Sequence, residues 1–196
     1  MEITANYPAA ISALLIITAI AVLLSQRFPG RWRWPVLIIV VLVTLVPLQV
    51  TSIYRWVQGA AGELSIVTLI LLAGFISRRL SGREIISYHA RRHLYFLILL
   101  TGFLLYPATL GLSAYDPYRA GFGLVLPLLI IALALLYWVL RQCQVAIILL
   151  IAMVAWKLEI MTSLNTWDYL LDPLLWLASP VILLIMYRRS KKEIAT

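Results

Sequence analysis

One stretch of the sequence, at residues 156–173, combines side-chain types that could do chemistry. It reads WKLEIMTSLNTWDYLLDP and carries four charged residues between two strongly apolar runs. Asp168 and Asp172 are four residues apart, so they would share one face of a continuing helix. A carboxylate pair of this kind could hold a divalent cation or exchange protons. The plainer interpretation is a helix start capped by Asn165, because acidic side chains are favoured at the positive end of a helix.

Lys157 and Glu159 lie at the beginning of this stretch, near the end of an apolar run that starts at about Val145. A helix rises ~1.5 Å per residue, which puts Lys157 roughly 18 Å along it. If that helix crosses a membrane, Lys157 either extends its charge to the surface or belongs to an intramembrane polar site. The two residues are only two positions apart and point to different faces, so each needs its own partner.

A second polar stretch, YPATLGLSAYDPYRAGFG, occupies residues 106–123. Pro117 predicts a turn, across which Asp116 and Arg119 are close enough in sequence to pair. Both stretches contain an Asp-Pro step and tyrosines, which favours packing of one on the other. We therefore expect one outward-facing polar cluster, formed by Asp116, Arg119, Lys157, Glu159, Asp168 and Asp172.

His89 and His93 have the i, i+4 spacing that can present two imidazoles to one metal ion. A metal site needs further ligands, and only Glu84 and Cys143 are available on the same predicted side. We expect no metal and no cofactor, with these histidines as the weak alternative. The single cysteine also excludes an internal disulfide and a four-cysteine metal site.

The elements that position these residues are predicted from composition. Of 196 residues, 63% are apolar and 12% charged, and the mean hydropathy is +0.98. Soluble domains are nearer half apolar and a quarter charged. Residues 1–196 are therefore expected to form a single transmembrane domain.

A membrane-spanning helix needs about 20 mostly apolar residues. Seven runs approach this length, and the third is interrupted near its start by Gly59, Gly62 and Glu63. The predicted spans are approximately 8–26, 35–53, 57–77, 94–112, 122–140, 145–162 and 169–187.

Charge predicts the orientation of this all-α bundle, because Lys and Arg collect in cytoplasmic loops. With seven spans, all 16 basic residues except Arg55, Arg119 and Lys157 fall on one side. The prediction is a seven-helix transmembrane bundle with short loops, an outer N-terminus and a cytoplasmic C-terminus. Short loops and the arginine bias favour a multi-pass protein of the bacterial cytoplasmic (inner) membrane.

The loop between the third and fourth spans contains five arginines, and each basic residue near an anionic leaflet contributes about 1 kcal/mol. The expected anionic-lipid contacts are Arg78, Arg79, Arg83, Arg91 and Arg92. The net charge of +8 thus indicates membrane lipids as partners and not nucleic acid.

No complete catalytic constellation is present, so the leading prediction is a non-enzymatic partner or assembly subunit of cell-envelope machinery, bound to another membrane protein. Two alternatives remain open at this stage. A small transporter or lipid-handling protein would use Lys157 and Glu159, and an outward-facing lipid head-group enzyme would use Asp116, Asp168 and Asp172.

Overall fold

A computed structural model describes residues 7–48, 51–112 and 116–194. In these ranges the fold is all-helical apart from one pair of two-residue strands, β1 (Pro47–Leu48) with β2 (Thr51–Ser52). The chain divides into two compact units, Met1–Leu64 with Leu69–Ile85, and Ser65–Thr68 with Ile86–Thr196. The predicted sides of both chain ends concern residues outside the described ranges.

The first unit is built around a long apolar helix that packs against the two helices after it. Its elements are α1 (Tyr7–Ser25), the 3-10 turn η1 (Gly30–Trp32), α2 (Arg33–Leu45), α3 (Ile53–Ala61) and all but the first turn of α4 (Ile66–Ser81). The buried Ser12 hydroxyl of α1 accepts a 2.9 Å hydrogen bond from the Leu64 amide. This bond fixes the chain after α3 against the start of α1.

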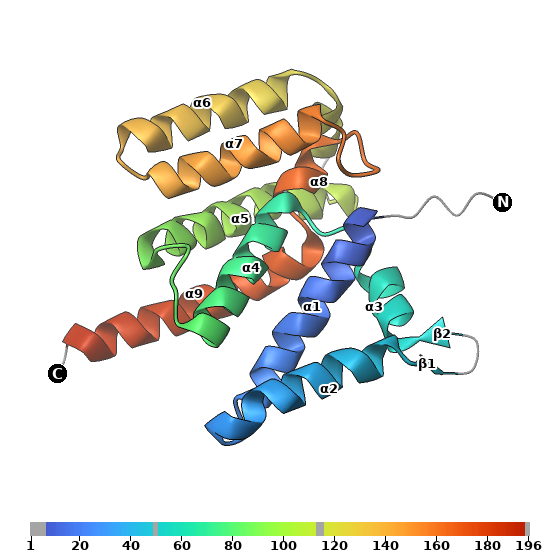
Figure 1. The fold of residues 1–196 in the computed structure, drawn as a ribbon. Helices are drawn as coiled ribbons and strands as arrows, with labels where there is room; N and C mark the ends of the chain where they lie inside the picture. Colours follow the sequence, from blue (N-terminus) through green and yellow to red (C-terminus); the bar gives the residue numbers. More distant parts are fainter. Residues whose placement is uncertain (1–6, 49–50, 113–115, 195–196) are drawn as a thin grey trace. The chain divides into compact units, whose positions relative to one another are not determined.

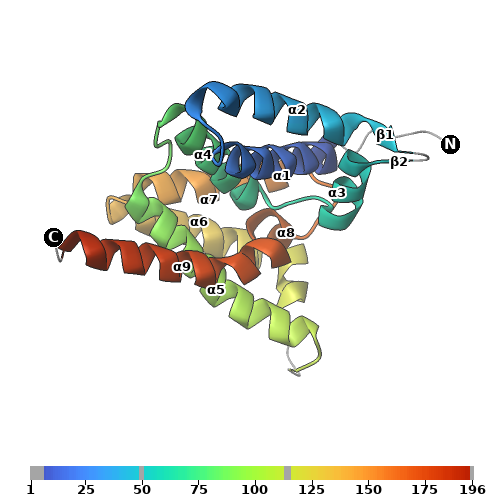
Figure 2. The same cartoon turned by 90° about the horizontal axis from the view of Figure 1, so that it is seen from below.

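The second unit consists of two helix pairs, α6 with α7 and α5 with α9, and α5 also contacts α7 (Figure 1). Figure 2 shows that α5 and α9 cross each other where they pack. The elements are α5 (Tyr88–Thr109), the 3-10 turn η2 (Pro117–Phe122), α6 (Val125–Val139), α7 (Cys143–Lys157), α8 (Thr166–Leu170) and α9 (Pro173–Ile194). Its core contains the fully buried Leu94, Val145 and Tyr169.

Two of the predicted spans are each two helices in the structure. Span 57–77 is broken between α3 and α4, where Gly62 has a φ of +61° and Ser65 accepts a hydrogen bond from the Thr68 amide. Span 169–187 is broken at Leu171, whose backbone is extended between α8 and α9. Glycine and helix-capping residues end helices, so these breaks lie where the backbone is redirected.

Helices α5, α6 and α7 end in the same pair of backbone hydrogen bonds, a Schellman motif. The residue that follows each helix cap is left-handed: Gly111 with φ +81°, Arg141 with φ +61° and Glu159 with φ +50°. Glycine adopts this conformation freely, whereas Arg141 and Glu159 adopt it at a steric cost.

Candidate functional site

The most extensive polar contact in the second unit joins η2 to the segment around α8. We call residues 117–122 and 163–170 together the η2–α8 platform. Asn165 caps α8 by accepting from the Trp167 amide at 3.0 Å, which confirms the predicted cap. The Asn165 side-chain amide donates to the Tyr118 carbonyl at 3.0 Å, and the Trp167 indole donates to the Pro117 carbonyl at 2.9 Å.

Close backbone packing at Gly121 completes the platform. The Thr166 hydroxyl donates to the Gly121 carbonyl at 3.0 Å. A Cβ at position 121 would lie 1.7 Å from the Asn165 side-chain oxygen, so only glycine fits without displacing that buried cap. Two segments of the sequence, whose bonded residues are 45 to 50 positions apart, are thereby held in one arrangement.

Asp168 lies inside the platform with its carboxylate engaged. Its Oδ2 accepts hydrogen bonds from the Tyr118 hydroxyl, at 2.9 Å, and from the Ser163 hydroxyl. Burial, together with the hydrogen bond to Asp168 and its charge, raises the pKa of Tyr118 to about 12. The phenol therefore stays protonated at neutral pH and acts as a donor to the carboxylate, not as a base.

Asp172 forms a separate arrangement, which we call the Asp172 junction. One carboxylate oxygen accepts from the Leu175 amide at 2.8 Å and caps the start of α9. The other accepts from the amide and hydroxyl of Ser65, at 3.4 and 3.1 Å, and from the Thr68 hydroxyl. The charge thus lies where the N-termini of α4 and α9 meet, and both helix dipoles favour an anion there. The same dipoles disfavour a bound cation.

The other predicted cluster members lie at the surface. Asp116 is exposed and caps η2 by accepting from the Tyr118 amide at 3.0 Å. Arg119 and Lys157 are exposed, and Glu159 is exposed at its left-handed position after α7. Within the described chain, no hydrogen bond or ion pair joins two of the six predicted residues. Their convergence as one charge cluster stays a prediction.

Several partners of the two carboxylates were not predicted from the sequence. The predicted span 57–77 puts Ser65 and Thr68 inside a continuous helix, although a serine directly before an apolar run is a helix N-cap signal. Tyr118 and Ser163 gave no signal of their own, because hydroxyl donors to Asp168 are identified only once the loops are placed.

The predicted inner residues divide between the two units. Arg78 pairs with Glu84 at 3.1 Å, and the Arg79 side chain donates to the Gln26 side-chain oxygen at 2.7 Å. Arg83 is exposed in the same unit, whereas the second unit holds Arg91, which is half-buried, and Arg92, which is exposed.

The two histidines are on the first turns of α5. His89 is exposed with its ring edge-on to Tyr88, and His93 is half-buried beside the Tyr137 ring. In the part of the chain that the structure describes, no group of three His, Cys, Asp or Glu side chains is arranged to hold a metal ion.

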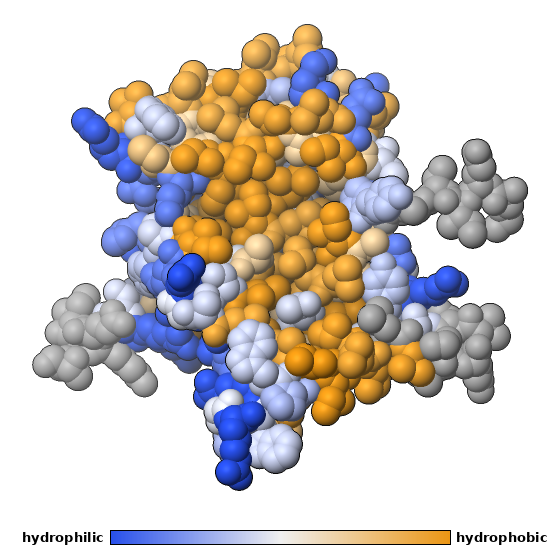
Figure 3. Space-filling view, viewed as in Figure 1, coloured by the Kyte–Doolittle hydropathy of each residue, from blue (hydrophilic) through white to orange (hydrophobic). Residues whose placement is uncertain are grey.

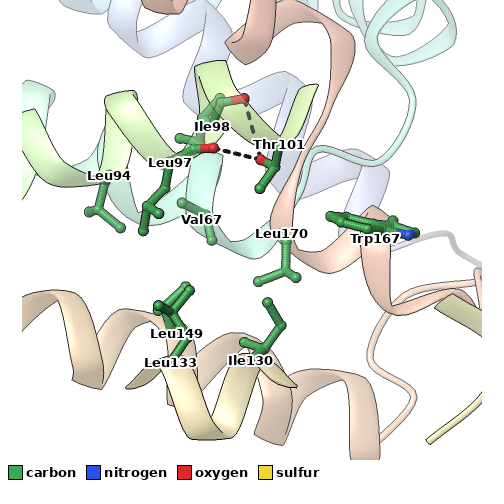
Figure 4. A pocket seen from close by; sticks show the side chains of 10 residues that line it. All are labelled: Val67, Leu94, Leu97, Ile98, Thr101, Ile130, Leu133, Leu149, Trp167 and Leu170. Atoms are coloured by element: carbon green, nitrogen blue, oxygen red, sulfur yellow. Dashed lines mark hydrogen bonds between the residues drawn. The ribbon is translucent and has the colours of Figure 1, made fainter. Parts of the chain in front are cut away.

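A small apolar cavity lies between the helices of the second unit (Figure 4). Its volume is about 40 Å³, and its lining includes Leu94, Ile130 and Leu149. Thr101 also faces it, but this hydroxyl donates to the Leu97 carbonyl of its own helix at 2.7 Å. An apolar cavity of about 40 Å³ is far smaller than the several hundred Å³ of a substrate pocket.

Among the residues that the structure describes, α1 is the one helix long and apolar enough to cross a membrane, and α6 and α7 are shorter apolar helices. A buried helix of a soluble protein or a signal sequence meets the same criterion. The chain matches no family model, and no curated protein and no solved structure gives a significant match.

Proposed function

We propose that this chain is a multi-pass protein of the bacterial inner membrane that serves as a non-enzymatic subunit of envelope machinery. In the proposed topology its seven predicted spans put η2 and α8 outside, and the arginine-rich loops inside. The alternatives of a transporter and of a lipid head-group enzyme find less support.

Long-range hydrogen bonds support the topology, because they join segments that it assigns to the same side. The η2–α8 bonds connect two predicted outer loops. On the predicted inner side, Arg79 donates to Gln26, and the Ser87 amide donates to Gln144 at 2.9 Å. Each of these bonds joins two residues that the proposed topology puts on the same side.

Exposed apolar side chains support burial in lipid. Along α6, Leu128, Leu135 and Val139 are 63%, 58% and 75% exposed. Figure 3 shows a broad hydrophobic surface over the α6–α7 hairpin, with hydrophilic atoms gathered at both of its ends. Soluble monomers rarely expose apolar patches beyond a few hundred Å².

The flanking residues lengthen this apolar band. Helices α6 and α7 each have 15 residues, which corresponds to about 22 Å. Exposed Phe122, Leu124 and Leu140 extend α6, and Leu158 and Ile160 extend α7. A slightly short span is accommodated by local thinning of the bilayer.

The observation that carries the non-enzymatic proposal is that the carboxylates of Asp168 and Asp172 are both hydrogen-bonded within the protein. Asp168 is held by Tyr118 and Ser163, and Asp172 caps α9 and is held by Ser65. Lys157 and Glu159 are exposed at the end of α7 and line no described cavity. A platform with satisfied polar groups is suited to presenting a fixed surface to another protein.

Site-specific photo-crosslinking tests this proposal. A crosslinker at the exposed Arg119 or Leu164 of the platform should give a discrete protein adduct in intact membranes. A crosslinker at exposed Leu135 of α6 should give lipid adducts only.

A matched glycine pair provides the control. Gly121→Ala displaces the Asn165 cap and should abolish the adduct. Gly123→Ala should retain it, because a Cβ added at position 123 would lie 3.8 Å from the nearest atom, the Ala120 carbonyl oxygen. Absence of any adduct from both platform positions, with normal membrane levels, would refute the subunit proposal.

A further inference from the structure

A polar cavity of about 170 Å³ lies in the first unit, where the end of α1, the start of α2 and the end of α4 meet. Its polar lining is supplied by Ser25, Gln26, Arg33 and Arg79, and Trp34 forms part of its wall. It is larger than the roughly 30 Å³ share of one water, so a polyatomic ligand fits.

Arg79 is held in position beside this cavity. Its Nη1 donates to the Gln26 side-chain oxygen at 2.7 Å, and its guanidinium lies 5.5 Å from the centre of the Phe75 ring. One of five N–H donors is thereby used, and the others remain for a ligand. Because the side chain is already oriented, ligand binding costs less side-chain conformational entropy.

Arg33 adds a second positive charge at the first position of α2. The preceding residue, Trp32, gives this helix no side-chain cap, so the positive end of the helix dipole lies near Arg33. Among the described lining residues none is acidic. Glu84, an acidic residue of this unit, forms an ion pair with Arg78 at 3.1 Å.

We propose that this Arg33–Arg79 pocket binds a phosphate group. Guanidinium groups present paired N–H donors that match phosphate oxygens, and two of them around one cavity can contact one tetrahedral anion. The Ser25 hydroxyl donates to the Val22 carbonyl at 2.9 Å, so the arginines and the Gln26 amide supply the donors.

The source of the phosphate is the head group of an anionic phospholipid in the inner leaflet, an assignment that rests on the proposed membrane function. The exposed Trp32 and Trp34 beside the pocket are the residue type that favours a membrane interface. Free phosphate shares the same chemistry and is a separate arm of the test.

Binding is measured by the tryptophan fluorescence of the full chain in zwitterionic detergent. The protein is titrated with inorganic phosphate and, in separate experiments, with phosphatidylglycerol and with phosphatidylcholine. Phosphatidylglycerol should bind at least tenfold more tightly than phosphatidylcholine. Arg33→Gln and Arg79→Gln should each weaken binding at least tenfold, and the exposed controls Arg31→Gln and Arg83→Gln less than threefold.

Gln26→Glu is a second variant, which keeps both arginines. A carboxylate at position 26 would pair with Arg79 and should abolish binding while leaving the unfolding midpoint unchanged or raised. Equal effects of all four arginine variants would mean diffuse charge attraction and would overturn the pocket.

The two arms separate the pocket from the membrane proposal. Binding of inorganic phosphate that Arg33→Gln and Arg79→Gln each weaken at least tenfold, with no binding of either lipid, would support the phosphate site and overturn its lipid source. Binding of neither ligand would overturn the inference, while membrane insertion, measured independently by fractionation, would leave the proposed function standing.

Discussion

At the scale of single residues, the two carboxylates of the opening stretch have different partners. Asp168 accepts from the hydroxyls of Tyr118 and Ser163, whereas Asp172 is 6% exposed, caps α9 and accepts from Ser65 at the start of α4. The loss of one acceptor at such a buried point leaves donors unsatisfied, which costs about 1–3 kcal/mol.

Asp172→Asn should therefore lower the free energy of unfolding by about 1–3 kcal/mol. Asparagine still caps α9, because Asn and Asp cap equally well, but its amide confronts the donors of Ser65 and Thr68. Denaturant titration in detergent measures the change. Combined with Ser65→Ala, the two effects should be less than additive, because both remove the same contact.

Asp116→Asn is the matched control, since that exposed cap has no second helix to satisfy. It should change the free energy of unfolding by less than about 0.5 kcal/mol. Equal losses from the two substitutions, or additive losses with Ser65→Ala, would show that the Asp172 junction is not a stabilising contact.

At the scale of elements, the apolar runs predicted where helices form, because every predicted span overlaps at least one helix. The break at Gly62–Ser65 has local signals in Gly62 and Ser65, but hydropathy alone predicted neither this break nor the one at Leu171. Both breaks lie beside the contact of Ser65 and Thr68 with Asp172, more than 100 residues away. Local patterns predict where helices can form, whereas this long-range contact is visible only in the fold.

The same limit applies to the candidate site. Asn165 was predicted as a cap because its signal is local, whereas the partners of Asp168 come from a turn about 50 residues earlier. Glu159 was grouped with functional charges from its residue type alone. Its left-handed backbone after α7 gives it a role in ending that helix.

Glu159→Gly should consequently stabilise the protein by about 1 kcal/mol, because glycine adopts the left-handed conformation without steric cost. Gly111→Ala, at the equivalent position after α5, should destabilise it by a similar amount. Both are measured as shifts in the unfolding midpoint. A destabilising Glu159→Gly would mean that its carboxylate contributes more than its backbone conformation costs.

At the scale of the whole molecule, the proposed topology assigns polar groups to both sides of the membrane. It assigns the η2–α8 platform and the Asp172 junction to the outer side, and the Arg33–Arg79 pocket to the inner side. This topology would explain both the arginine bias and the exposed apolar side chains, whereas in a soluble chain the two features would have no common cause.

Cysteine accessibility in intact cells tests this topology most directly. In a background with Cys143→Ser, single cysteines replace Arg119 and Leu164 on the predicted outer side, and Arg31 and Arg188 on the predicted inner side. A membrane-impermeant thiol reagent should label Arg119→Cys and Leu164→Cys in intact cells. It should label Arg31→Cys and Arg188→Cys only after the membrane is permeabilised. Labelling of all four in intact cells, or of the inner pair alone, would contradict the seven-span topology.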